Sequence, residues 1–322
     1  MELDRALNIY RTMVEIRDFE MKAIWLFENN YLRGSVHVYV GEEAIASTVC
    51  SRLTDEDYIA STHRGHGHCI AKGARLDYAM AELMGKQTGY CKGRGGSMHI
   101  ADLTKGNLGA NAIVAGGVPI ATGAALACKM KGNKNVAVSF FGDGATNEGV
   151  FHEALNMASI WKLPIVYVCE NNGYGISVPA WQSTAVEDIS VRAAAYDMPG
   201  ETVDGNDVEA IDAAFARALE RAKSGKGPSL IECKTYRWMG HWTGDPQNYR
   251  TREEVEAWKE KCPIKRFKKR LIEMGADAAE IEKIEESSRE SVEAAARFAI
   301  DSPLPDPAHV LDDVFYEGGA EL

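Results

Sequence analysis

Two residues with oxygen side chains stand at the ends of neighbouring apolar runs in the segment 138–172. The first run ends in Gly-Asp-Gly at 142–144, and the second ends in Asn-Asn at 171–172. Parallel strands present their carboxyl ends as a ligand crevice. Asp143 and Asn172 would supply hard oxygen ligands, which suit a Mg²⁺ ion that shares its coordination with phosphates. The pattern therefore predicts a site for Mg²⁺ and a diphosphate.

The residues between these two ends support the same interpretation. Either half alone is more often structural, as a surface turn or an unrelated pair of asparagines. Here 26 residues separate the two halves, and each half follows an apolar run. The glycines at 142 and 144 allow a close approach of the backbone. A helix expected to begin within 145–149 would offer free N–H groups to an anion.

A cluster of imidazoles lies earlier in the chain, in the HRGHGH turn. His63, His66 and His68 surround Arg64 there. Imidazoles at this spacing can share a zinc ion, and they can also be structural. Arg64 would repel a bare cation, and its guanidinium suits a phosphate through bidentate donation. The turn is therefore predicted to bind a phosphate or a substrate.

Two further histidines stand in different surroundings. His37 alternates with valines in RGSVHVYVGEEA, which places it opposite them if the segment is extended; a lone histidine there is more often exposed. His241 closes the segment TYRWMGH at the start of a loop, where catalytic side chains are commonly held on a rigid sheet. The small residues of 109–114 surround an isoleucine and a valine, which would fit the entry to a core helix equally well.

Helix and strand patterns alternate along the part of the chain that must position these residues. Strands alternating with helices predict right-handed βαβ units and a parallel sheet. A long amphipathic helix is expected at the N-terminus and a structured loop at 85–117, which holds nine glycines. The other expected helices are 42–52, 118–131, 147–160, 187–196 and 207–223, and the expected strands are 58–60, 135–141, 165–170, near 201–203 and 229–235. Residues 236–251 are expected to form a second long loop and 252–300 to be helical.

Composition narrows the class of protein. The net charge of −11 argues against a nucleic-acid surface. No apolar run approaches the roughly 20 residues of a membrane span, and the N-terminus lacks a signal-peptide core, so we expect a cytoplasmic protein with no membrane partner. Seven widely spaced cysteines without a CxxC pair indicate reduced thiols. With no linker in view, we expect one domain over 1–322, with a helical C-terminal extension from about 252.

The Gly-Asp-Gly and Asn-Asn pattern resembles the thiamine diphosphate fingerprint. The segments STHRGHGHCIAKG, CKGRGGSMHIADL, ENNGYGISVP and IECKTYRWMGH look like the α subunit of the thiamine-dependent first component of 2-oxo acid dehydrogenase complexes, and among these like acetoin dehydrogenase. The resemblance runs from about residue 5 to 310. It implies the thiamine diphosphate-binding fold, an α/β architecture with a parallel sheet flanked by helices on both faces and with N- and C-terminal helical extensions.

The resemblance also implies roles for individual residues. Asp143, Asn172 and Tyr174 would bind the metal ion, and Arg64 and His63 the diphosphate. The backbones of Ala112 and Val114 would contact the aminopyrimidine. His37, His66 and His241 would take part in catalysis. The full cofactor-binding set implied in this way is His63, Arg64, Ala112, Val114, Gly142, Asp143, Gly144, Ala145, Asn172, Tyr174 and His241.

The implied reaction is cleavage of a carbon–carbon bond and transfer of an acetyl unit to a lipoyl-bearing acyltransferase. In the family, a glutamate that activates the cofactor comes from a separate β subunit, so an α2β2 assembly is expected. Acetoin, pyruvate and branched-chain 2-oxo acids remain open as the small-molecule substrate. A nicotinamide dehydrogenase is disfavoured because GDGATNEG lacks the GxGxxG spacing. A scaffold subunit without a cofactor is disfavoured because the ligand residues are present.

Overall fold

The fold is given by a computed structural model that describes residues 1–312 and 314. The expected helical C-terminal extension can be followed to residue 312, and residues 313 and 315–322 of its predicted range lie outside the described residues.

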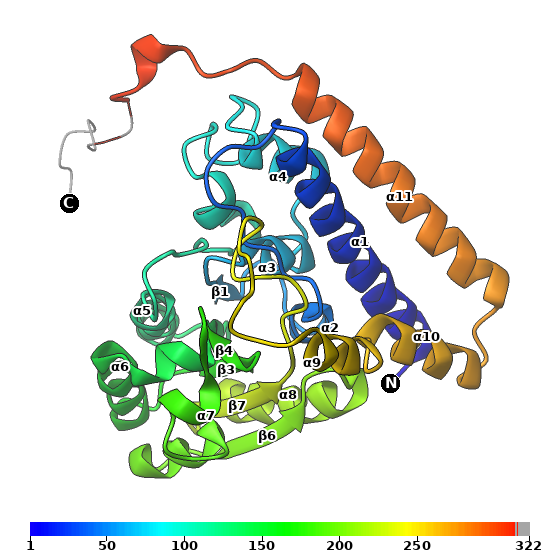
Figure 1. Cartoon of the computed structure of the whole chain (residues 1–322). Coiled ribbons are helices and arrows are strands. Elements are labelled where there is room, and N and C mark those ends of the chain that lie inside the picture. Colours follow the sequence, from blue (N-terminus) through cyan, green and yellow to red (C-terminus); the bar gives the residue numbers. More distant parts are fainter. Residues whose placement is uncertain (313, 315–322) are drawn as a thin grey trace.

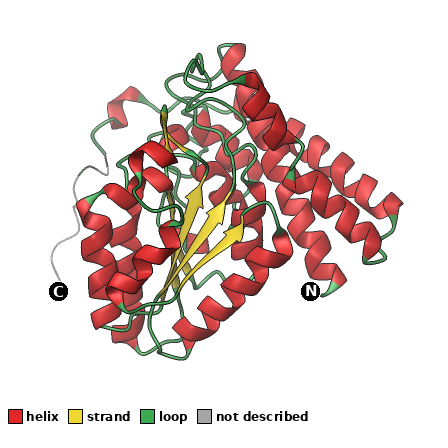
Figure 2. Ribbon diagram, turned by 60° about the horizontal axis from the view of Figure 1, so that its bottom comes forward, coloured by secondary structure: helices red, strands yellow, loops and turns green. Residues whose placement is uncertain are grey.

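A parallel sheet forms the centre of the molecule (Figure 2). Within the described residues it has five strands in the order β1-β2-β3-β7-β6, and every neighbouring pair is parallel. The strands are β1 (Tyr58–Ala60), β2 (Ala137–Gly142), β3 (Ile165–Asn171), β6 (Gly200–Asp204) and β7 (Ser229–Lys234). Because β2 and β3 pair in register up to Gly142 and Glu170, their carboxyl ends lie side by side.

Helices cover both faces of this sheet. The period of two along a strand sends alternate side chains to opposite faces. Val138 and Phe140 of β2 pack in one apolar cluster with α2 (Glu43–Cys50) and α8 (Val208–Lys223). Ala137 and Phe141 pack in another with α5 (Gly117–Lys131) and α6 (Gly149–Ile160). The predicted fold class, a parallel sheet between two helical layers, is confirmed.

Long helices from the two ends of the chain lie side by side. Figure 1 shows α1 (Leu3–Glu28) along α11 (Ala278–Asp301), and the two are in contact. The region predicted as one helical stretch is broken into α9 (Arg252–Lys259), α10 (Pro263–Glu273) and α11. Pro263 begins α10, where its missing N–H costs no helix hydrogen bond.

Connections around the site differ from the prediction in detail. Residues 143–147 form a 3₁₀ turn, η3 (Asp143–Asn147), and the α-helix α6 begins only at Gly149 because Glu148 is extended. The predicted helix 187–196 is likewise a 3₁₀ segment, η4 (Ile189–Tyr196). The glycine-rich stretch 85–117 is a loop, as predicted, containing η1 (Gly96–Met98) and η2 (Leu103–Lys105). The remaining short elements are α3 (Gly65–Ala71), α4 (Leu76–Leu83), β4 (Tyr174–Gly175), β5 (Val178–Pro179), α7 (Ala180–Ser183) and η5 (Pro307–His309).

None of the helices among residues 1–312 combines the length and the apolar character that crossing a membrane would require.

Candidate active site

A cavity of about 450 Å³ opens beyond the carboxyl ends of β2 and β3. It lies where the sequence pattern places a ligand crevice. Twelve of the predicted site residues line it: His37, His63, Arg64, Ala112, Val114, Gly142, Asp143, Gly144, Ala145, Asn172, Tyr174 and His241. His66 is not among the lining residues. The fold thus gathers residues from six segments of the chain around one cavity.

Asp143 lines this cavity and follows β2 directly. Its side chain is 1% exposed, and Oδ2 has no hydrogen-bond partner among the described residues. Burial raises the pKa of this carboxyl to about 6. A buried carboxylate oxygen without a partner is costly unless a cation or a donor reaches it. The geometry therefore suits a divalent cation at Oδ2.

Asn172 is hydrogen-bonded to Glu42, a residue that the sequence pattern did not indicate. Its Nδ2 donates to the Glu42 carboxyl at 3.3 Å, and its Oδ1 accepts from the backbone N–H of Tyr174 at 3.4 Å. Glu42 is 1% exposed, and burial together with the charge of Glu170 raises the pKa of Glu42 to about 8. The two contacts together orient the amide, because the backbone N–H of Tyr174 requires Oδ1 on its side and leaves Nδ2 to donate to Glu42.

Arg64 connects two parts of the cavity wall. Nη1 donates to the backbone oxygen of Val38 at 3.0 Å, and Nη2 donates to that of His241 at 2.6 Å. The guanidinium is 3% exposed. Burial and the nearby charge of Arg237 lower the pKa of Arg64 to about 9, which leaves it charged at neutral pH.

Arg237 is a second buried cation that the sequence reasoning missed. It is 1% exposed, lines the cavity and places Nη1 3.4 Å from Nδ1 of His241. In its segment TYRWMGH, the sequence predicted a site role for the histidine alone. Two guanidiniums at one cavity make a strongly anion-attracting wall.

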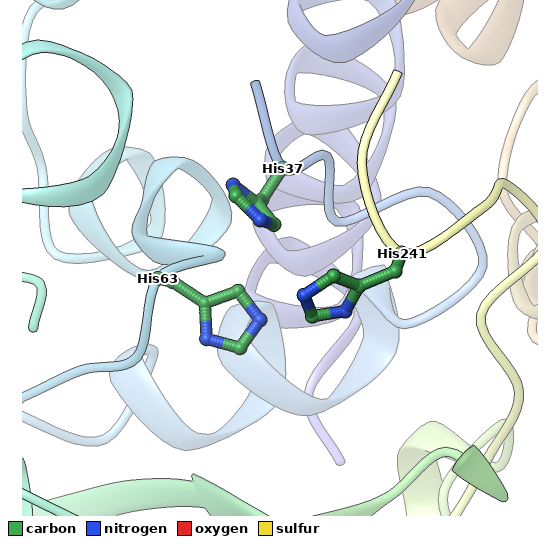
Figure 3. Close-up of side chains that lie close together, drawn as sticks. All are labelled: His37, His63 and His241. Atoms are coloured by element: carbon green, nitrogen blue, oxygen red, sulfur yellow. The ribbon is translucent and has the colours of Figure 1, made fainter. Parts of the chain in front are cut away.

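Three imidazoles converge on the cavity. Figure 3 shows the rings of His37, His63 and His241 turned toward one another, and their centroids are 4.8 to 5.2 Å apart. Burial, followed by the charge of Arg64, lowers the pKa of His37 to about 3 and that of His241 to about 4. The same causes lower the pKa of His63. All three rings are therefore neutral near pH 7, and each has one unprotonated ring nitrogen that can accept a hydrogen bond.

His37 is buried, at 6% exposed, and lines the cavity. The exposed position that the valine pattern alone favoured is therefore wrong, and the catalytic role that the resemblance implies stays a prediction. The valines at 36, 38 and 40 are buried as well, since the segment runs between the helical layer and the cavity and both of its faces are covered.

The zinc alternative applies to a different set of histidines from the one considered in the sequence. Within the described residues, ring nitrogens of His37, His63 and His241 lie within 4.8 Å of one another, whereas the sequence had suggested the set His63, His66 and His68. Arg64 and Arg237 approach the same His241 nitrogen at 3.3 and 3.4 Å. Their charges repel a metal ion and attract an anion, so the phosphate interpretation of this wall is the better supported.

The three histidines of the HRGHGH turn lie in different surroundings. His66 bonds to Glu20 at 2.8 Å and to Ser97 at 3.0 Å, both away from the cavity lining. His68 bonds to Ser61 at 2.8 Å and to Glu170 at 3.0 Å. Of the three histidines of the turn, His63 is the one that lines the cavity.

Residues 113 and 114 form an apolar lip. Ile113 is 74% exposed and Val114 is 50% exposed, and both line the cavity. The reading of these residues as a core helix entry is wrong, because α5 begins only at Gly117 and the two side chains precede it.

Comparison with known proteins finds one family and relatives that match nearly the whole chain. The profile of the family described as dehydrogenase E1 component matches residues 11–308. The α subunit of the acetoin:2,6-dichlorophenolindophenol oxidoreductase of Bacillus subtilis is 55% identical over 319 residues, which cover 98% of this chain and 96% of that protein. The subunit of the same name from Cupriavidus necator is 44% identical over 317 residues, covering 98% and 95%. The pyruvate dehydrogenase E1 component subunit alpha of Porphyra purpurea is 41% identical over 309 residues, covering 94% and 90%.

Proposed function

The chain belongs to the dehydrogenase E1 component family, and from this membership we propose that it is the α subunit of a thiamine diphosphate-dependent acetoin dehydrogenase. The two acetoin oxidoreductase subunits at 55% and 44% identity support acetoin as the substrate. In this proposal the acetyl unit from the cleaved substrate passes to a lipoyl-bearing acyltransferase.

The residues of the cavity fit the proposed cofactor. Asp143 offers an unpartnered buried oxygen to Mg²⁺, with Asn172 and the backbone of Tyr174 as the other proposed protein ligands. Arg64 and His63 would bind the diphosphate, and the glycines at 142 and 144 with Ala145 would leave room for it. The observation that carries the proposal is this pairing of an orphan carboxylate with a wall of guanidinium and imidazole groups.

The ring end of the cofactor would lie against the apolar lip. Ala112 and Val114 are proposed to contact it, since both line the cavity and Val114 belongs to the apolar lip. Thiamine diphosphate supplies a carbanion-forming centre when bound, and the protein supplies orientation and proton transfer. His37 and His241 are neutral at physiological pH and are proposed to take part in catalysis by hydrogen-bonding the reacting groups there.

A β subunit is the proposed partner in an α2β2 assembly. The relatives are named as α subunits, which supports the existence of a second kind of chain. The exposed Ile113 and Val114 beside the cavity support a cover supplied by another chain. We expect the α chain alone to be nearly inactive, and measurable lipoyl-linked turnover by it would contradict this.

Two coarser features complete the proposal. We propose that 1–322 forms a single domain, since the end helices α1 and α11 pack together against the rest of the chain. A reducing, cytoplasmic location is proposed because all seven cysteines lie in the described part of the chain and are unpaired, six of them buried.

Pyruvate is the second candidate substrate. The relative named pyruvate dehydrogenase at 41% identity favours it. The test is coexpression with the β subunit, followed by dichlorophenolindophenol reduction with acetoin, pyruvate or 3-methyl-2-oxobutanoate. The proposal expects acetoin to give the highest kcat/KM, and a preference for either 2-oxo acid would replace it.

A further inference from the structure

The segment 36–40, which carries His37, is extended but belongs to no strand in the described part of the chain. One edge of it faces the loop that carries His241. There the carbonyls of Val36 and Val40 accept from the backbone N–H groups of Thr243 at 3.0 Å and Trp238 at 3.1 Å. The carbonyl of Val38, between them, accepts from Arg64.

On the other edge, the N–H groups of residues 37 and 39 donate to side chains. The N–H of His37 donates to Ser97 Oγ at 3.4 Å, and the N–H of Tyr39 donates to Glu20 Oε1 at 2.9 Å. His66 lies between these two acceptors. Its Nδ1 is 2.8 Å from Glu20 Oε2, and its Nε2 is 3.0 Å from Ser97 Oγ.

These contacts form one connected set of hydrogen bonds. Nε2 of His66 also lies 3.1 Å from the backbone oxygen of Ser97, so the ring contacts Ser97 through its carbonyl and its hydroxyl, and Glu20 through its carboxylate. The hydroxyl oxygen of Ser97 also accepts from the N–H of His37. The set closes on Glu20, whose carboxylate accepts from the N–H of Tyr39.

Burial makes this chain costly to break. The exposed fractions are 0% for Glu20, 1% for His66 and 9% for Ser97. A buried polar group that loses its hydrogen-bond partner costs the full free energy of removing that group from water. Phe19 closes over His66 with its ring edge-on at a centroid distance of 6.0 Å. Water therefore has little access to replace a missing bond.

We propose that His66 is a positioning residue, whose Glu20–His66–Ser97 chain fixes the backbone of His37 and so aims the His37 imidazole into the cavity. The inference rests on the proposed function for the part of it that concerns catalysis. The HRGHGH turn then fixes the segment 36–40 from both edges, because Arg64 donates to the carbonyl of Val38 on the opposite edge.

Two substitutions separate the two bonds of the ring. In His66→Asn the amide N–H takes the place of Nδ1, which keeps the bond to Glu20 and removes the bond to Ser97. In His66→Gln the amide reaches the place of Nε2 and loses Glu20. The readouts are hydrogen–deuterium exchange of the peptide spanning 36–40 in the α chain, and the kinetics of the enzyme coexpressed with its β subunit.

The expected result is specific to the segment. Exchange within 36–40 rises about tenfold in both variants, since one buried hydrogen bond per variant is lost. Exchange in strands β2 and β3 stays as in the parent chain. With acetoin, kcat falls by about tenfold or more while KM changes by less than about threefold, because the misplaced imidazole still lies in an intact pocket. His152→Gln, which removes an exposed histidine bonded to Tyr196, serves as the control and changes neither readout.

Three outcomes would overturn the inference. A fall in kcat with unchanged exchange at 36–40 would mean that His66 acts on the reacting groups directly. Faster exchange throughout β2 and β3 would mean that His66 serves only overall stability. Unchanged exchange and unchanged kcat would remove any role for the hydrogen-bond chain. Failure of the coexpressed enzyme on all three substrates would refute the proposed function instead, because the exchange measurement needs no turnover.

Discussion

Arg64 donates a hydrogen bond of 2.6 Å to the backbone oxygen of His241. The same guanidinium bonds to Val38, next to His37, so one buried cation joins the two segments that bring these histidines to the cavity. The group that attracts an anion is therefore also the group that sets the distance between two histidines of the site. Binding at Arg64 and the placement of the loop 236–251 are expected to be coupled.

Arg64→Lys tests this coupling. Lysine keeps the charge but has no planar fork, so it cannot donate to both carbonyls in the same geometry. We expect cofactor affinity to fall about tenfold and proteolysis within 236–251 to become faster. Calorimetry with thiamine diphosphate and Mg²⁺, together with limited proteolysis, measures both. Arg75→Lys, which alters an exposed pair with Asp77, is the control. Equal affinity and equal cleavage for Arg64→Lys and the parent chain would show that the two functions are separate.

Asp143→Asn tests the metal site. The amide is neutral and nearly the same size, so the cavity is kept while the anionic ligand is lost. Affinity for thiamine diphosphate in Mg²⁺ is expected to drop by about 100-fold or more. Without Mg²⁺ the variant and the parent chain should bind alike. Asp188→Asn, at an exposed carboxylate paired with Lys234, should retain full affinity. Undiminished metal-dependent binding by Asp143→Asn would rule out this carboxylate as the ligand.

Acid is expected to destabilise the chain through the histidine cluster. Burial and Arg64 hold the pKa of His37 at about 3 and that of His241 at about 4 in the fold, against about 6.5 in the unfolded chain. Because the unfolded state binds more protons below about 6.5, stability is present above that pH and is lost as pH falls toward about 3.

Thermal unfolding of the α chain from about pH 7.5 to about pH 4.5 measures this effect. In the double variant His37→Gln and His241→Gln, Tm should fall less steeply with acid than in the parent chain. His309→Gln removes an exposed histidine paired with Asp312 and should leave the slope unchanged. Parallel slopes for the double variant and the parent would contradict the prediction.

Gly67→Ala tests the packing under the HRGHGH turn. A Cβ at this position would lie 2.2 Å from Cδ1 of Tyr39. Overpacking of this kind costs about 1–3 kcal/mol, so the free energy of unfolding in urea should fall by that amount. Gly123→Ala is the matched control, since a Cβ there meets nothing within 4 Å inside α5. It should gain about 0.5–1 kcal/mol from helix propensity, and equal losses in the two variants would contradict the packing argument.

The sequence predicts the sheet and its ligand edge well, because both follow from local patterns. Apolar runs of six or seven residues ending in Asp143 and Asn172 become adjacent strands, and the period of two decides which side chains enter which layer. Boundaries are less well predicted at 143–149 and 187–196, where a 3₁₀ turn replaces the first part or the whole of an expected helix.

Residues behind the cavity could not be found this way. Glu42 bonds to Asn172 across 130 positions of sequence, and Glu20 reaches His66 across 46. Their importance arises from burial and proximity, which no local spacing encodes. The valines around His37 favoured an exposed position for the same reason, because a local pattern gives no sign of the second layer that covers this segment.

The exposed pair Ile113 and Val114 has a consequence for how the chain must be made. Exposed apolar side chains at the mouth of a cavity favour self-association until a partner subunit buries them. A cell that synthesised this chain in excess over the proposed β subunit would accumulate α chains prone to aggregation. Matched synthesis of the two subunits is therefore expected.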